Sequence, residues 1–368
     1  MSLTTAARAA GSSSTMNKPD CAWNLSDLES VPKNGVKVFS TFACGGGSTM
    51  GYKLAGCEVV GANDIDPEMA YHYKLNLNPR LYFLCPIGDL LTAELPEELF
   101  SLDILDGSPP CSTFSMAGSR EKAWGKEKHF REGQAKQVLS DLFFDYLSLV
   151  ERLRPKVAIA ENVKGMLLGN AKGYTKLVMQ RFREIGYKPQ LFLVNAADCG
   201  VPQRRERVFF CALREDIDAP PLKLEMKHRW ISAGEATRDL QELTDAEKVD
   251  TRACPMDLEW YKKTVPGDDQ GYARAVQREG LKRKLFSHMR FSSKKPVNTL
   301  TSESGCFMHW SECRSLTFRE WKRLGSFPDD YKAKTDKIGK YMIGMSVPPR
   351  MMEVVARQVI EQWIEKAR

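Results

Sequence analysis

The sequence has little cysteine and histidine and no long hydrophobic run. Its 368 residues include ten cysteines, none of them in a Cys-x-x-Cys pair, which indicates reduced thiols in a cytoplasmic protein rather than a disulfide scaffold. The five histidines form no His-x-x-x-His pair, and Cys306, His309 and Cys313 are irregularly spaced, so we expect no metal site. No stretch approaches the about 20 apolar residues that cross a bilayer, so we expect no membrane span.

Acidic residues are absent before Asp20, and the same segment lacks the apolar core of a signal peptide. We expect residues 1–34 to form a flexible tail, of which residues 1–15 are an appended leader ahead of Met16. Across the whole chain the formal net charge is +7, which is compatible with a polyanionic partner.

Short apolar runs alternate with helical stretches from Val36 to Leu213. The expected strands are 36–39, 57–60, 102–105, 157–160, 191–194 and 208–211, and the expected helices include 67–76, 138–153 and 174–185. This alternation predicts an α/β fold with a mostly parallel sheet covered by helices. The rhythm breaks after Leu213, and a last helix is expected over 351–367, so we place a main domain at 35–225, a smaller domain at 226–337 and a returning C-terminal helical segment at 338–368.

The turn after the first expected strand, Phe42-Ala43-Cys44-Gly45-Gly46-Gly47, is rich in glycine and leads into a helical pattern. Such a turn lets backbone N–H groups approach a ligand, as in nucleotide-binding sheets, although a tight structural turn has the same composition. Asp64 ends the second strand and Asp89 follows the third. Each acid alone is more often a turn or cap residue, but acids at neighbouring strand ends favour a nucleotide-like ligand.

The strongest local signal is Ser108-Pro109-Pro110-Cys111, which follows an apolar strand. Two prolines fix the backbone and present one thiol at the carboxyl edge of the sheet. Glu161 ends the next strand, and Gln203-Arg204-Arg205-Glu206-Arg207 precedes the last one. A helix cap and a solvated turn are the plainer interpretations of these two motifs. Because a reactive thiolate needs a nearby positive charge or base, the three motifs together predict an active site.

These motifs, in this order and spacing, resemble those of DNA cytosine-5 methyltransferases of the bacterial or phage type. The resemblance extends from Val36 to the C-terminus and includes the segments 314–320, 325–330 and 343–348. It implies a Rossmann-like S-adenosylmethionine-dependent methyltransferase domain with a smaller inserted target-recognition domain. It also implies methyl transfer to C5 of cytosine in duplex DNA.

The resemblance assigns catalytic roles to Pro110, Cys111, Glu161, Asn162, Arg205 and Arg207. The Cys111 thiolate would add to C6 of a flipped-out cytosine, so that C5 can accept the methyl group. Glu161 would contact N3 and the exocyclic amine. Arg205 would hold the base carbonyl, and Arg207 would support the loop or the base.

The implied methyl donor is S-adenosylmethionine, with S-adenosylhomocysteine as the product. The residues carried over for binding it are Phe42, Ala43, Gly45, Gly46, Asp64, Ile65, Asp89, Leu90, Ser346 and Val347. The chain departs from the family pattern at two positions. Cys44 stands where the family usually has glycine, and Met345 stands where it usually has asparagine before Ser-Val.

The resemblance implies DNA contacts by Ser115, Gln203, Arg283, Lys284 and Arg290. Segment 115–137 is similar to the loop that closes over the flipped base, and segment 270–296 carries eight basic residues against one acid, a charge that would follow phosphates. Solvated surface segments are the alternative. We expect a monomer that acts on duplex DNA, with a cognate restriction endonuclease acting separately.

Two other functions fit the same motifs. An RNA cytosine methyltransferase would carry a Cys-Phe-Thr element in the recognition region, and none occurs between Leu213 and Arg314. A catalytically silent DNA-binding homologue is the other alternative. The retention of Cys111, Glu161 and Arg205 argues against it.

Overall fold

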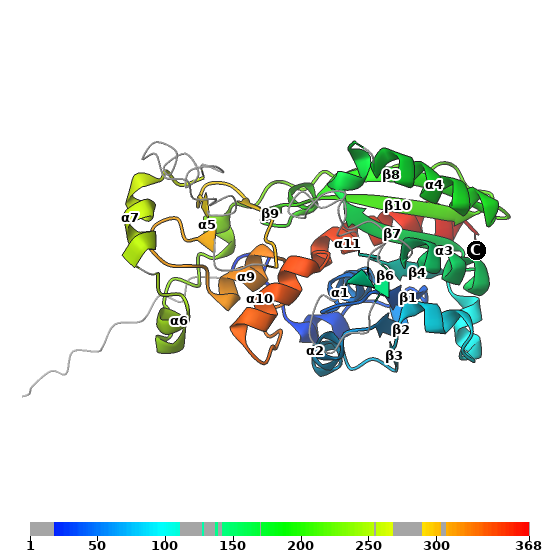
Figure 1. The fold of residues 1–368 in the computed structure, drawn as a ribbon, viewed down its shortest axis with the longest axis horizontal. Coiled ribbons are helices and arrows are strands. Elements are labelled where there is room, and N and C mark those ends of the chain that lie inside the picture. Colours follow the sequence, from blue (N-terminus) through cyan, green and yellow to red (C-terminus); the bar gives the residue numbers. More distant parts are fainter. Residues whose placement is uncertain are drawn as a thin grey trace, which may run out of the picture.

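The structure is a computed structural model. It describes residues 18–110, 142–169, 171–253, 255–267, 289–302 and 307–367, and the backbone of two short paired strands, β5 (Glu127–Lys128) and β6 (Gln137–Val138). Two lobes are evident in Figure 1. The larger lobe contains the central sheet with helices on both faces. The smaller lobe contains α5, α6 and α7, with α9 and α10 on the side where it meets the larger lobe.

The central sheet has seven strands in the order β3-β2-β1-β4-β7-β10-β8. Their bounds are β1 Lys37–Thr41, β2 Glu58–Asp64, β3 Leu81–Leu84, β4 Ile104–Gly107, β7 Val157–Val163, β8 Tyr187–Asn195 and β10 Glu206–Arg214. Strands β1, β2, β3, β4 and β7 pair in parallel, whereas β10 is antiparallel to both β7 and β8. The predicted mostly parallel sheet is therefore confirmed, with one reversed strand.

Helices cover both faces because successive strand residues point to opposite sides. In β10, Val208 and Phe210 join the hydrophobic core beneath α3 (Leu142–Leu153) and α4 (Ala171–Glu184), whereas Phe209 and Cys211 join the core beneath α1 (Gly47–Leu54) and α11 (Pro349–Val359). The chain continues beyond α11 as a π-helix at Ile360–Ile364 and a 3-10 turn at Glu365–Ala367.

Local sequence sets several helix ends. Helix α2 (Pro67–Leu77) begins after Asp66, whose carboxylate accepts hydrogen bonds from the backbone N–H groups of Glu68 and Met69. Helix α4 ends before Gly186, which adopts a left-handed conformation (φ 82°) that glycine favours. Helix α3 starts at Leu142, later than the predicted start at Val138, because residue 138 belongs to β6.

The smaller lobe shares a hydrophobic core with α1 and α2. Its elements are α5 Ala233–Ala236, α6 Asp245–Asp250, α7 Pro255–Lys263, β11 Met289–Arg290, β12 Val297–Asn298 and β13 Phe307–Met308, followed by α9 Phe318–Leu324 and α10 Asp336–Met345. Leu300, Trp321 and Ile343 pack in one cluster with Met50 of α1 and Tyr73 of α2. The two lobes are therefore joined by apolar packing as well as by the chain.

Residues 18–34 differ from the flexible tail that the sequence predicted. The segment contains a 3-10 turn, Leu25–Glu29, and Trp23 is only 4% exposed. The Trp23 indole Nε1 donates a hydrogen bond to the carbonyl of Ser326 at 2.9 Å, and the Leu25 N–H donates to the Asp330 carboxylate at 2.8 Å. Burial of the large indole surface holds this segment against the shared core. Residues 1–17 lie outside the described part of the chain.

Within the described ranges, every helix is too short or too polar to span a membrane.

Replacing the buried indole tests the importance of this anchor. Trp23→Ala should lower the free energy of unfolding by about 3–5 kcal/mol, because it leaves a large cavity, as measured by urea denaturation. The half-exposed Trp230 provides the control, and Trp230→Ala should cost less than about 1 kcal/mol. Equal effects of the two substitutions would contradict a core role for residues 18–34.

Candidate active site

The carboxyl ends of the parallel strands gather the predicted site residues at one edge of the sheet. Phe42 follows β1, Asp64 ends β2, Pro109 and Pro110 follow β4, and Glu161 lies near the end of β7. This edge is where open α/β sheets place their ligands. Cys111 and Ser115 continue directly from Pro110 but lie outside the described residues, as do Arg283 and Lys284.

Glu161 and Arg207 form a buried ion pair across β7 and β10. Arg207 Nε lies 2.9 Å from Glu161 Oε1, and both side chains are largely buried. Burial raises the pKa of the Glu161 carboxyl, while the nearby Arg207 and Arg205 lower it. The site therefore contains a buried carboxyl group held by a guanidinium at the carboxyl edge of the sheet.

Asn162 connects this strand to the proline turn. Its side-chain Nδ2 donates to the carbonyl of Pro109 at 3.0 Å, and its Oδ1 accepts from the N–H of Val163 at 2.8 Å. Since Pro109 and Pro110 immediately precede Cys111, these bonds fix the point from which the thiol-bearing segment leaves the sheet. Asn162 is thus a positioning residue in this structure.

Arg205 is buried near Glu161 and bonds two distant segments of the chain. The side chain is 3% exposed, and Nη1 donates to the backbone carbonyls of Leu300 and Gly344, each at 3.0 Å. Arg205 stands between β10 of the main sheet and the short strand β9 (Gln203–Arg204), which pairs with β12 of the smaller lobe. Arg207, which lies inside β10, is the arginine paired with Glu161.

Gln203 and Arg290 are also engaged inside the protein rather than free to contact DNA. Gln203 is 1% exposed, and its amide bonds the backbone of Leu324 and Leu300. The Arg290 guanidinium donates to the carbonyls of Trp310, Tyr261 and Thr264, and it lies 3.9 Å from the centre of the Tyr261 ring. The side-chain N–H groups of Gln203 and Arg290, which were predicted to contact DNA, therefore donate to backbone carbonyls within the protein.

The predicted donor-binding residues fall into exposed and buried groups. Phe42, Asp64 and Ile65 are partly exposed, and Asp89 is exposed in the 3-10 turn Ile87–Leu91. Leu90 and Ala43 are instead buried in hydrophobic clusters. The first group offers side-chain surface to a ligand at this edge.

Asp64 holds the glycine-rich turn against the second strand. Its carboxylate accepts hydrogen bonds from the N–H of Cys44 at 2.7 Å and the N–H of Asp66 at 2.9 Å. Burial raises the pKa of Asp64 to about 6, against the lowering effect of these donors. Cys44, one of the two departures from the family pattern, contributes its backbone N–H to this contact, while its thiol donates to Met69 Sδ at 3.6 Å.

The glycines of this turn serve packing. Gly46 has a left-handed backbone (φ 84°), and a Cβ there would lie 2.3 Å from Leu77. Gly45 is buried, and a Cβ at this position would lie 2.8 Å from the hydroxyl of Tyr331. The turn thus brings α1 close to α2 and α10.

The last motif faces the same turn. Val347 is buried, and its carbonyl packs against Gly47. Ser346 is also buried, and its Oγ has no hydrogen-bond partner among the described residues. Met345, the second departure, is 47% exposed.

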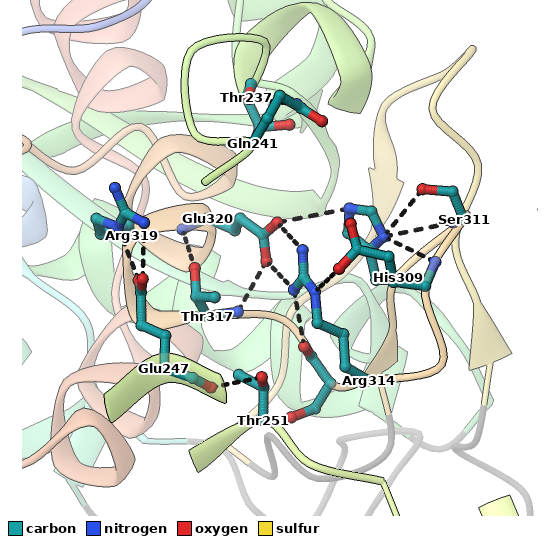
Figure 2. A network of polar contacts seen from close by, with 12 residues as sticks. Thr237, Gln241, Glu247, Thr251, His309, Ser311, Arg314, Thr317, Arg319 and Glu320 are labelled. Carbon is teal, nitrogen blue, oxygen red and sulfur yellow. Dashed lines mark hydrogen bonds and ion pairs between the residues drawn. The ribbon is translucent and has the colours of Figure 1, made fainter. Parts of the chain in front are cut away.

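A polar network in the smaller lobe escaped the sequence analysis, and Figure 2 shows it. Arg314 donates to both carboxylate oxygens of Glu320 at 2.9 and 2.8 Å, while Arg319 pairs with Glu247 of α6. His309 lies 3.5 Å from Glu320, and burial, followed by the charge of Arg314, lowers its pKa to about 3. The sequence gives little sign of this network, because its charged residues come from separate segments of the chain.

The described residues contain no candidate metal centre. The residues that the structure describes contain no group of three or more His, Cys, Asp or Glu side chains able to hold a metal ion. A cavity of about 280 Å³ lies in the smaller lobe, where Leu243, Arg252 and Cys313 form part of its lining. This cavity is separate from the Glu161 site.

Asp106 is a second residue that the sequence analysis did not assign a role. It is 1% exposed in β4, where its carboxylate accepts hydrogen bonds from Ser40 Oγ at 2.7 Å and the Tyr52 hydroxyl at 3.1 Å. Burial raises its pKa from an ordinary value of 3.8 to about 7. The carboxyl therefore joins β1, β4 and α1 directly beneath the proline turn.

This shift predicts a pH-dependent stability. A raised folded-state pKa stabilises the fold below about pH 4, and that contribution is lost as the pH rises towards 7. Asp106→Asn removes the titration, so the stability of the variant minus that of wild type should increase across this window in urea denaturation. Asp218→Asn changes an exposed carboxyl and serves as the control. If the stability difference between Asp106→Asn and wild type stayed constant with pH, the raised pKa of Asp106 would be contradicted.

Comparison with known proteins agrees with the fold and identifies the family. The family model for C-5 cytosine-specific DNA methylases matches residues 36–361. The Type II methyltransferase M.FnuDI of Fusobacterium nucleatum is 28% identical over 353 residues, covering 90% of this chain and 96% of the relative. M.HpaII of Haemophilus parainfluenzae is 26% identical over 369 residues, covering 94% and 96%.

Solved structures share the fold. A prophage-encoded E. coli protein, described as a DNA modification methyltransferase, has a TM-score of 0.68 at 20% identity, covering 89% of this chain and 99% of that one. The Dnmt2 methyltransferase of S. pombe has a TM-score of 0.58 at 16% identity, with the same coverage. Since the family model spans most of the chain, the protein belongs to the C-5 cytosine-specific DNA methylase family and is a DNA cytosine-5 methyltransferase.

Proposed function

We propose that the protein methylates a cytosine that is rotated out of duplex DNA and held between Glu161 and the Cys111 thiol. The observation that carries this proposal is the buried Glu161 carboxyl, paired with Arg207 and lying next to the proline turn that precedes Cys111. A carboxyl held in this way can bind the polar edge of a pyrimidine ring. Rotation is required because C5 and C6 of a stacked base cannot be reached by protein groups.

The chemistry begins with the thiolate of Cys111. It adds to C6, and the electron pair of the C5–C6 double bond makes C5 nucleophilic. After C5 has taken a methyl group, loss of the C5 proton re-forms the double bond and expels the thiolate. The thiolate is thus regenerated, and the base leaves as 5-methylcytosine.

Glu161 and Arg207 stabilise the ring during addition. Glu161 binds N3 and the exocyclic amine, where charge changes as the thiolate adds. The burial that raises the pKa of this carboxyl favours its protonated form, which can share a hydrogen with N3. Arg207, rather than Arg205, lies beside Glu161 to hold it and the base.

The methyl donor that fits this edge is S-adenosylmethionine. Asp64 and Asp89 provide carboxylates for ribose hydroxyls and the adenine amine, Phe42 and Ile65 provide partly exposed apolar surface, and the unpartnered Ser346 Oγ provides a polar contact. When bound, this donor supplies an electrophilic methyl group on a sulfonium. The protein's contribution is to orient it above C5.

The smaller lobe, at residues 226–337, supplies target recognition in this proposal, with Arg283 and Lys284 contacting phosphates. We further propose a cytoplasmic monomer that works beside a separate restriction endonuclease. Comparing methyl incorporation into duplex DNA and into tRNA tests the choice of substrate, and transfer to tRNA alone would overturn it.

Trapping the covalent intermediate tests the role of Cys111. Wild type should form a stable adduct with duplex DNA that contains 5-fluorocytosine, because fluorine at C5 blocks the elimination that frees the thiol. Cys111→Ala should form none, as judged by denaturing gel electrophoresis. Cys21→Ser, at another free cysteine, should react like wild type. An adduct with Cys111→Ala, or none with wild type, would contradict the mechanism.

Replacing the carboxyl tests Glu161 separately. Glu161→Gln should lower the single-turnover rate of methyl transfer at least about 100-fold, because the amide cannot share a proton with N3. DNA affinity, measured by fluorescence anisotropy, should change little. Glu206 is a partly exposed neighbour in β10 that pairs with Lys164, and Glu206→Gln should keep a near-normal rate. Equal rates for the two variants would remove Glu161 from the catalytic step.

A further inference from the structure

The segment 203–205 lies where the two lobes meet. Strand β9 pairs in parallel with β12, with Gln203 opposite Val297 and Arg204 opposite Asn298. Figure 1 shows β9 between the lobes. The buried Gln203 side chain donates to the Leu324 carbonyl at 3.2 Å and accepts from the Leu300 N–H at 3.0 Å. This segment therefore bonds the smaller lobe through both its backbone and its side chains.

Arg205 adds a third segment to this junction. A single nitrogen, Nη1, donates to the Leu300 carbonyl of the smaller lobe and to the Gly344 carbonyl in the last turn of α10. Gly344 packs closely against residue 301: a Cβ on Gly344 would lie 2.2 Å from the Thr301 carbonyl oxygen. Three stretches that are far apart in sequence thus converge on one buried guanidinium.

The junction lies close in sequence to residues proposed to bind the methyl donor and to residues proposed to bind the target base. Two residues after Gly344 comes Ser346, whose unpartnered Oγ faces the glycine-rich turn, and two residues after Arg205 comes Arg207, the partner of Glu161. Arg205 is close enough to Glu161 and Arg207 to feel the charge of both. Its hydrogen bonds, however, go to backbone carbonyls.

We propose that Arg205 is a positioning residue that fixes the smaller lobe and the end of α10 against the catalytic sheet. It does so through its paired bonds to Leu300 and Gly344. This inference rests on the proposed function, which takes the Glu161–Arg207 pair as the site of chemistry and the smaller lobe as the part that holds DNA. DNA held by the smaller lobe then reaches that pair in a fixed orientation.

Four variants separate an effect on DNA binding from an effect on the rate of methyl transfer. Arg205→Ala should raise the half-saturating concentration of duplex DNA about tenfold, while the single-turnover rate at saturating DNA and S-adenosylmethionine stays within about threefold of wild type. Arg205→Lys should recover most of the affinity, since an ammonium can also donate to both carbonyls. The matched Arg207→Ala should bind DNA nearly normally and lose at least about 100-fold in rate.

Gly344→Ala probes the same junction without altering the arginine, in case Arg205→Ala fails to fold. Its new methyl group must push residue 301 away, so it should reproduce the loss of DNA affinity with a near-normal rate at saturation. Circular dichroism establishes that each variant is folded. Unchanged DNA half-saturation in Gly344→Ala, or a 100-fold loss of rate at full affinity in Arg205→Ala, would overturn the proposal.

A failure of the proposed chemistry would look different. If wild type transferred no methyl group, the mechanism would fall, but equilibrium DNA binding by fluorescence anisotropy would still rank the variants. Weaker binding by Arg205→Ala and Gly344→Ala than by wild type and Arg207→Ala would support the junction. Equal binding by all four proteins would overturn it.

Discussion

The ion pair between Glu161 and Arg207 is the interaction on which the site depends. It exists because β10 runs antiparallel beside β7, so that the start of one strand meets the end of the other. Both groups are buried, and removing one partner of such a pair typically costs about 3–5 kcal/mol because a charge is left uncompensated. Asn162 attaches the proline turn to the same strand end. The pair thus orients the carboxyl and the turn that precedes Cys111 together.

Polar groups buried between the lobes extend this arrangement to the rest of the protein. Gln203 and Arg205 bond backbone groups of the smaller lobe, and Arg314 and Glu320 satisfy each other inside it. The surrounding cluster joins Leu300 and other residues of the smaller lobe to α1 and α2. Since buried polar groups must find partners at fixed positions, they specify one arrangement where apolar packing alone would permit several. The sheet edge and the smaller lobe therefore form one packed body.

Sequence reasoning located most of the fold because its signals are local. The runs 157–160 and 208–211 lie inside β7 and β10, and Gly186 ends α4 where it was expected. Trp23 was missed because a single tryptophan in a polar segment gives no periodic signal, and its burial depends on a surface formed near Ser326. The start of α3 was placed too early because residue 138 pairs with another strand.

By itself, the sequence determined the family, the order of the motifs and the residue types available for chemistry, because spacing along the chain survives without knowledge of the fold. Only the tertiary structure decided which arginine serves which purpose. Arg205 and Arg207 are two residues apart and chemically identical, yet one bonds Leu300 and Gly344 and the other pairs with Glu161. The same applies to Gln203 and Arg290, whose donors are used internally. Hydrogen-bond partners brought from distant segments set these roles, and no local pattern encodes them.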